Sequence, residues 1–180
     1  RINCLMELRD LGYQIGAGFM VGAPYQTDAD VAADLKFIEN IKPDMCGIGP
    51  FVPHHATPFS GYEGGTVEET CYLISIMRLI YPRMLIPATT ALGTIDRKGR
   101  EKGMLSGANV VMPNLSPAEV RGKYEIYDNK LSSGEEASEN LDKLDRSLRR
   151  IGFQIVVDRG DIKLDPGGSG ETRDLAMAGP

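Results

Sequence analysis

The sequence is poor in the residues on which many catalytic and metal sites depend. It has 180 residues, of which three are cysteine and two are histidine, and it has no tryptophan. The cysteines, Cys4, Cys46 and Cys71, lie far apart and form no CxxC pair. This spacing argues against a disulfide framework or a local metal knuckle and is ordinary for the reducing cytoplasm. We therefore expect a cytoplasmic protein whose cysteines are small, buried apolar side chains.

Long apolar runs and basic clusters are missing as well. No stretch of about 18 unbroken apolar residues is present, so we expect no membrane span. Twenty basic residues against 25 acidic ones give a net charge of −5 without a basic run, which argues against binding to a nucleic-acid backbone. Small-molecule chemistry or a protein partner fits this composition better.

What the sequence does contain is an alternation of apolar strands and amphipathic helices. Strands are expected at residues 13–21, 45–51, 84–90 and 108–114, with capped helices starting at Thr27 and Thr66 and a weaker helix at residues 97–105. Further helices are expected at residues 116–127 and 133–151, followed by a short terminal strand at residues 153–158. The alternation predicts an α/β fold with a parallel sheet covered by helices.

Four strands are too few to close an eight-stranded barrel, which needs roughly 250 residues. We therefore interpret residues 1–158 as the C-terminal half of a (βα)8 TIM-type barrel, with C-terminal helices and the short terminal strand attached. Residues 159–180 lack periodicity and are rich in glycine, so a disordered tail is expected there.

The candidate site lies at the carboxyl ends of the strands, where parallel α/β proteins bind ligands. The residues expected there are uncharged and dense in glycine, proline, hydroxyl and amide groups, which suits enclosing a reactive species better than proton transfer. Gly47 and Gly49 either let a ligand approach the backbone or relieve packing against a helix. Thr89 and Thr90 point to opposite sides of an extended chain, so at most one faces the cavity unless the strand breaks.

For two pairs of side chains near this site, a purely structural role is the alternative to a functional one. Tyr124 and Tyr127 share a helical face and either close a pocket or simply pack. His54 and His55 are neighbours in an expected extended loop, so their side chains should diverge, and we expect no metal site there.

Four segments together resemble the later strands of radical S-adenosylmethionine enzymes of the biotin-synthase group, and most closely the radical S-adenosylmethionine maturases of [FeFe]-hydrogenase. They are "GAGFMVGAPYQT", "DMCGIGPFVPHHATP", "IPATTALGTIDRKGREKG" and "SGANVVMPNLSP". The resemblance runs from Arg1 to about Lys163, and the biotin and thiamin synthesis-associated region of the family corresponds to roughly residues 45–157.

The resemblance implies a set of site residues and partners. It places Arg1, Met45, Gly47, Gly49, Met112 and Tyr124 around S-adenosylmethionine, and Thr89, Thr90 and Tyr127 on the substrate side. The implied substrate is a small iron complex or a cysteine-derived molecule. The implied protein partners are the N-terminal half of the barrel and the GTPase scaffold of hydrogenase maturation.

Two departures from the family pattern limit what this chain can do. The CxxxCxxC motif that holds the family's [4Fe-4S] cluster is absent, so that cluster would be ligated outside these residues and the chain alone is expected to be inactive. Many relatives also hold an accessory cluster with three cysteines spaced Cys-x7-Cys-x2-Cys. This chain has Ser132, Asn140 and Lys143 at those positions, so we expect that second cluster to be missing as well. The alternatives are a non-catalytic α/β binding module derived from such an enzyme, or half of another enzyme of the group, such as a methylornithine synthase.

Overall fold

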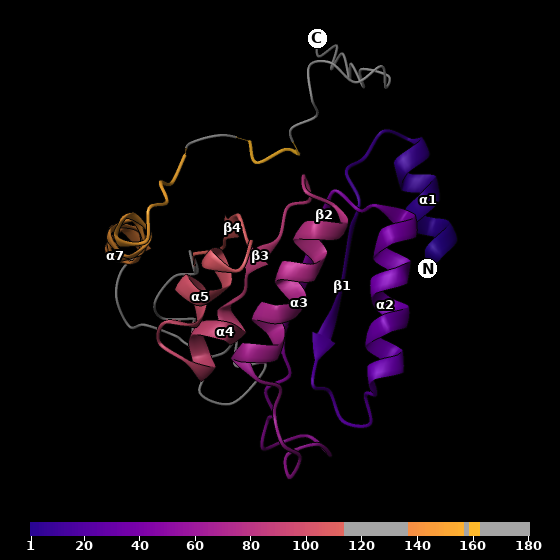
Figure 1. The fold of residues 1–180 in the computed structure, drawn as a ribbon, viewed down its shortest axis with the longest axis horizontal. Coiled ribbons are helices and arrows are strands. Elements are labelled where there is room, and N and C mark those ends of the chain that lie inside the picture. The colour runs from indigo at the N-terminus through magenta and orange to yellow at the C-terminus, as the bar shows by residue number, and fades with distance from the viewer. Residues whose placement is uncertain (114–136, 157–158, 163–180) are drawn as a thin grey trace.

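Helices and parallel strands alternate along the chain in the computed structural model, which describes residues 1–113, 137–156 and 159–162 (Figure 1). The described elements are α1 Ile2–Asp10, β1 Gly16–Val21, α2 Asp28–Ile41, β2 Met45–Pro50, α3 Val67–Ile80, β3 Pro87–Ala88, α4 Thr90–Ile95, α5 Gly99–Leu105, β4 Val110–Val111 and α7 Ala137–Arg150. The expected mixed α/β fold with parallel strands is confirmed.

The two strong helix starts are set by side-chain caps, as the sequence predicts. Thr27 caps α2 in a complete capping box with Asp30, and the Thr66 hydroxyl accepts a hydrogen bond from the backbone N–H of Glu69 at the start of α3. Each cap satisfies an N–H group that the first helical turn would otherwise leave without a partner. The α2 helix then ends at Lys42, which adopts a left-handed conformation with φ 49°.

The strands follow one another in parallel order. Strand β1 pairs with β2 from Gly16↔Met45 to Val21↔Pro50, and β3 pairs with β4. A parallel bridge between Met45 and Leu85 joins the two pairs. The described strands therefore run β1-β2-β3-β4, and all their carboxyl ends lie at one edge.

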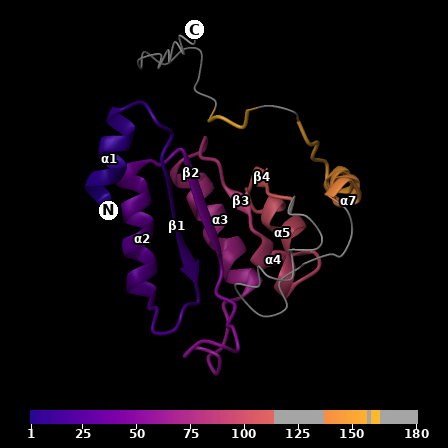
Figure 2. The same cartoon turned by 180° about the vertical axis from the view of Figure 1, so that it is seen from behind.

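Helices α2 to α5 lie on one side of the strands, as Figures 1 and 2 show from opposite directions. The apolar core fills the space between them, with Cys46 and Ile48 from β2 packed among α3 residues such as Ile74 and Met77. From the carboxyl-terminal part, Leu148 of α7 is 3% exposed and joins the same core. Among the described residues, none of the helices combines the length and apolarity needed to cross a membrane.

Asp44 and Asn109 tie the amino ends of the strands together. The Asp44 carboxylate accepts from the N–H of Ile15 at 2.7 Å, and the Asn109 Oδ1 accepts from the N–H of Ile86 at 2.8 Å. The backbone N–H of Asp44 also donates to the Ile15 carbonyl, and that of Asn109 donates to the Ile86 carbonyl, both at 2.9 Å. Each side chain thus closes the first rung of a parallel strand pair.

Several expected elements differ from the structure. Of the strand expected at 108–114, the described residues form a strand only at Val110–Val111. The strand expected at 84–90 is assigned only at Pro87–Ala88, and the single helix expected at 97–105 is preceded by a separate helix, α4. The terminal strand is wrong for its described residues, 153–156, which are irregular. Phe153 and Ile155 pack against the core while Val156 is 70% exposed, so the apolar alternation reflects one-sided packing without a pairing strand.

The expected helix at 116–127 and residues 163–180 of the expected tail lie outside the described residues. At the start of that tail, Ile162 donates its N–H to Gln14 Oε1 at 3.0 Å.

Candidate functional site

Glycine and methionine occupy the face of β1 and β2 that points away from the helices. Exposure alternates along both strands, with Val21, Cys46 and Ile48 buried on the helix side. Because side chains alternate across a strand, Gly18 and Met20 of β1 lie on the opposite face, beside their register partners Gly47 and Gly49. This glycine face leaves the backbone accessible between exposed side chains such as Met20, which is 58% exposed.

Gly49 makes room for Thr89. A Cβ added at Gly49 would lie 2.7 Å from Thr89 Oγ1. At Gly47 the nearest atom to an added Cβ is Pro87 Cγ at 3.9 Å, an ordinary contact. Gly49 therefore makes room for Thr89, the residue between β3 and α4, whereas Gly47 could carry a Cβ without a clash.

The Thr89 hydroxyl is the polar atom most suited to a ligand in this part of the site. Its Oγ1 is buried and has no hydrogen-bond partner among the described residues. An unpaired buried hydroxyl costs free energy, so a bound polar group would stabilise it. Thr89 and Thr90 are the predicted substrate-side residues that the structure describes, and of these two Thr89 is the one whose hydroxyl has no hydrogen-bond partner there.

The strand breaks between the two threonines. Strand β3 ends at Ala88, Thr89 is the N-cap residue of α4, and Thr90 is already helical. The Thr90 Oγ1 accepts a hydrogen bond from Arg100 at 3.3 Å. The break in the strand that would let both threonines approach one cavity is therefore present, although the Thr90 hydroxyl already accepts a hydrogen bond from Arg100.

Close backbone contacts fix the loops at the carboxyl ends of β1 and β2. A Cβ on Gly65 would lie 2.0 Å from the carbonyl oxygen of Val21, and one on Gly22 would lie 2.5 Å from the Cα of Gly65. Gln26 holds the loop after β1, since its Oε1 accepts from the Gly22 N–H at 2.7 Å and its Nε2 donates to the Met20 carbonyl at 2.8 Å. Gln26 was not predicted from the sequence. Its position shortly after the expected strand was the only indication that it would hold this loop.

The other predicted cofactor residues are more dispersed. Met112 follows β4 and is 51% exposed, near the carboxyl-end edge. Met45 starts β2, at the opposite edge, and lines a cavity of about 740 Å³ with Leu85, Val110 and Phe153. Arg1 is exposed at the amino end of α1. Tyr124 and Tyr127 lie outside the described residues.

The two histidines do not diverge as expected. Their rings stack with centroids 4.4 Å apart and an interplanar angle of 25°. The reason is a turn, in which His54 Nδ1 accepts from the N–H of Ala56 and the His54 carbonyl accepts from that of Thr57. Within the described residues, no group of three or more His, Cys, Asp or Glu side chains is placed to hold a metal ion.

The cysteines differ in environment. Cys46 is fully buried, and burial raises the pKa of its thiol to about 12. Burial also raises the pKa of Cys71, on α3. Cys4 is exposed, which corrects the expectation that all three are buried.

Comparison with known proteins finds relatives along most of the chain. The [FeFe] hydrogenase maturase subunit HydE of Thermotoga maritima is 46% identical over 131 residues, which are 73% of this chain and 38% of that protein. The 3-methylornithine synthases of Methanosarcina barkeri and Methanosarcina acetivorans are 27% and 26% identical over 86% and 84% of the chain, and 42% and 39% of their own lengths. The chain thus spans about two fifths of these relatives. No family model matches it.

These findings support a class and then a family. A mixed α/β fold with parallel strands, together with these relatives, is consistent with part of a radical S-adenosylmethionine fold. Within that class, the resemblance to the [FeFe]-hydrogenase maturases is confirmed by the 46% identity.

Proposed function

We propose that this chain is the C-terminal part of a radical S-adenosylmethionine enzyme that acts in assembly of the [FeFe]-hydrogenase H-cluster. The observation that carries the proposal is the 46% identity to a hydrogenase maturase over 131 residues. The order of four consecutive parallel strands with helices on one side supports it, because half of a (βα)8 barrel has this arrangement. The glycine face would then line the barrel interior.

The described residues fit S-adenosylmethionine and a small substrate. Gly47 could carry a Cβ without a clash, since the nearest atom would be Pro87 Cγ at 3.9 Å, and Thr89 offers a buried hydroxyl that lacks a partner among the described residues. When bound, S-adenosylmethionine supplies the radical chemistry of this enzyme class, while the protein orients it and excludes water. In our proposal Arg1, Met45, Gly47, Gly49, Met112 and Tyr124 hold this cofactor, and Thr89, Thr90 and Tyr127 face the substrate.

The cysteines of this chain do not fit a [4Fe-4S] cluster. Cys46 is buried in the core with a raised thiol pKa, Cys71 lies on α3, and Cys4 is exposed on α1. Cluster ligation needs several thiolates around one site. The proposal therefore assigns the cluster to a part of the enzyme outside this chain, and it treats the chain alone as inactive.

Three partners belong to the proposal. They are the N-terminal half of the barrel, a small iron-complex or cysteine-derived substrate, and the GTPase scaffold of hydrogenase maturation. The first would cover the edge of β1 that pairs with no strand among the described residues, since an unpaired parallel edge invites association.

A second candidate is half of a methylornithine synthase. Two relatives of that kind match 86% and 84% of the chain, a larger share than the maturase does, but at 27% and 26% identity. The higher identity to the maturase favours the first candidate. A non-catalytic module derived from such an enzyme is the third.

The test uses the natural gene product that contains this chain. After anaerobic reconstitution with iron and sulfide and reduction by dithionite, we expect it to cleave S-adenosylmethionine to 5′-deoxyadenosine. It should also restore hydrogenase activity to cells that lack their own maturase. A Thr89→Val variant should keep cofactor binding and lose substrate-dependent turnover, whereas Tyr72→Ala, on the exposed face of α3, should change neither.

Each competing function has its own outcome in this experiment. Formation of 3-methylornithine without restored hydrogenase activity would establish the second candidate instead. A natural gene product that neither cleaves nor binds S-adenosylmethionine would refute the radical enzyme altogether and leave the binding module.

A further inference from the structure

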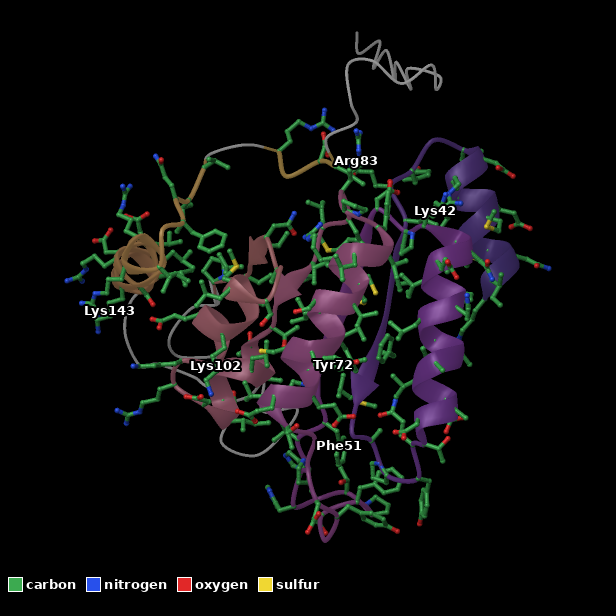
Figure 3. The ribbon with its side chains drawn as sticks, viewed as in Figure 1. Lys42, Phe51, Tyr72, Arg83, Lys102 and Lys143 are labelled. Atoms are coloured by element: carbon green, nitrogen blue, oxygen red, sulfur yellow. The ribbon has the colours of Figure 1, made fainter. Side chains whose placement is uncertain are left out.

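Four aromatic rings touch one another on the loops that follow β1 and β2. Tyr25 and Tyr62 have ring centroids 5.6 Å apart, Tyr62 and Phe59 5.5 Å, and Phe59 and Phe51 6.4 Å, all in edge-to-face geometry. The Tyr25 and Tyr62 hydroxyls are also hydrogen bonded to each other. We call these four residues the aromatic rim; one of them, Phe51, directly follows β2 and is labelled in Figure 3.

Three of the four residues of the aromatic rim remain exposed although their rings pack together, while Phe51 is half-buried. Tyr25 is 78% exposed, Phe59 41% and Tyr62 39%. Contiguous exposed aromatic surface is unusual on a protein without a partner, and tyrosine and phenylalanine are enriched at protein interfaces. The rim therefore has the composition of a docking surface.

Tyr25 is not required by the turn that carries it. The N–H of Gln26 donates to the carbonyl of Ala23, which closes a tight turn with Pro24 and Tyr25 at its centre. Tyr25 has φ 67°, a left-handed conformation that glycine adopts at no steric cost. The ring can therefore be removed by Tyr25→Gly without loss of the turn.

The loops that form the rim and the first turn of α2 beside them are acidic. Residues 22–30 and 51–66 contain Asp28, Asp30 and Glu63 and no lysine or arginine. Asp28 and Glu63 are exposed, and the hydrogen bonds that Thr27 donates lower the pKa of Asp30, which keeps that carboxylate ionised. Aromatic faces and carboxylates in one place attract the same kind of group, a cation.

We propose that the aromatic rim docks a basic segment of a partner protein, one that presents arginine or lysine side chains. The cationic groups would lie against the ring faces of Tyr25 and Tyr62, with Asp28 and Glu63 supplying the surrounding charge. This proposal does not depend on the enzymatic activity proposed above.

An acetylated and amidated hexaarginine peptide is the probe for this surface. It is titrated into the full 180-residue chain at pH 8, with binding followed by calorimetry and by amide NMR shifts. We expect saturable binding whose shifts centre on residues 22–30 and 51–66. Tyr25→Gly should weaken it about two- to fivefold, the range for loss of one exposed cation–π contact.

Matched variants separate the rim from general charge attraction. Glu63→Gln should weaken the peptide, whereas Glu7→Gln, which removes the same charge from exposed α1, should not. Tyr72→Ala removes a tyrosine that is 67% exposed on α3 and should also leave binding unchanged. Urea unfolding checks folding, and Tyr25→Gly should have an unchanged or raised midpoint, because glycine relaxes the turn.

Three results would overturn the proposal. They are equal weakening by Tyr25→Gly and Tyr72→Ala, peptide shifts centred away from the rim, and absence of saturable binding. Sedimentation of the chain without peptide adds a fourth, because a dimer that Tyr25→Gly dissociates would show that a second copy occupies the rim.

Discussion

Replacing Gly49 by alanine tests whether the glycine face is packed as the structure describes. The added Cβ would lie 2.7 Å from Thr89 Oγ1 and 3.5 Å from the Cβ and Cγ2 of the same residue. Overpacking of this kind costs about 1–3 kcal/mol. The Thr89 hydroxyl has no hydrogen-bond partner among the described residues, so its side chain can rotate and the cost should fall in the lower part of that range.

Alanine also brings a gain, which must be subtracted. A glycine inside a strand is less favourable than alanine by roughly 0.5–1 kcal/mol. The net destabilisation by Gly49→Ala should therefore be about 0–1.5 kcal/mol. Gly47→Ala is the matched control on the same face, since its new methyl group would be 3.9 Å from Pro87 Cγ, and it should be neutral or stabilising.

Urea unfolding followed by far-ultraviolet circular dichroism measures both variants. In a Thr89→Ala background the clash partner is gone, so Gly49→Ala should cost at least about 1 kcal/mol less than in the native background, a coupling typical of residues in contact. Equal midpoints for the Gly49 and Gly47 variants, or additivity with Thr89→Ala, would refute the contact and the geometry of the site built on it.

The remaining predictions concern buried groups. Burial raises the pKa of Cys46 from 9.0 to about 12, so the folded state holds this proton more tightly, and the free energy of unfolding should fall by up to about 1.4 kcal/mol per pH unit between pH 9 and pH 12; Cys46→Ala should remove this contribution to the slope, and an unchanged slope would contradict the assignment. At pH 8 a thiol reagent should label exposed Cys4 at once and Cys46 only on unfolding, and rapid labelling of the folded Cys4→Ser variant at Cys46 would count against its burial. Arg78 donates to the carbonyls of Gly107, Pro82 and Met84 at 2.8, 2.6 and 2.8 Å. Arg78→Met should therefore destabilise the chain by about 3 kcal/mol in the same urea assay, since hydrogen bonds to charged groups are worth about 1.5–3 kcal/mol each and are not additive; a loss below 1 kcal/mol would show that water replaces them.

Local signals predicted the elements that depend on neighbours in sequence. The Thr27 and Thr66 caps place a hydroxyl three residues before an N–H group, so the helix starts can be read from the spacing alone. The face of α7 could be read in the same way, because Leu148 follows from a repeat of about 3.6 residues and is buried.

Contacts between distant segments account for what the sequence could not predict. Two β-branched threonines favoured a continuing strand, whereas the structure starts α4 at Thr90, with Gly99 so near the Leu92 carbonyl that a Cβ would lie 2.0 Å from it. The stacking of His54 on His55 depends on a turn that lacks glycine. The contact between Tyr25 and Tyr62 joins loops 37 residues apart, beyond any periodicity.

The strand register that positions the candidate site is set at the amino ends of the strands, at the opposite end from the site. A slip of one residue between β1 and β2 would turn Gly47 and Gly49 toward the helices and bring Ile48 onto the open face. Asp44 opposes that slip, because its carboxylate and its N–H both bind Ile15 and its carbonyl accepts from the N–H of Leu85 at 2.9 Å. Asp44 thus helps to fix β2 against both β1 and the segment that precedes β3. The loops at the carboxyl ends of the strands do not set this register, so they can place Thr89 and the aromatic rim around a ligand or a partner.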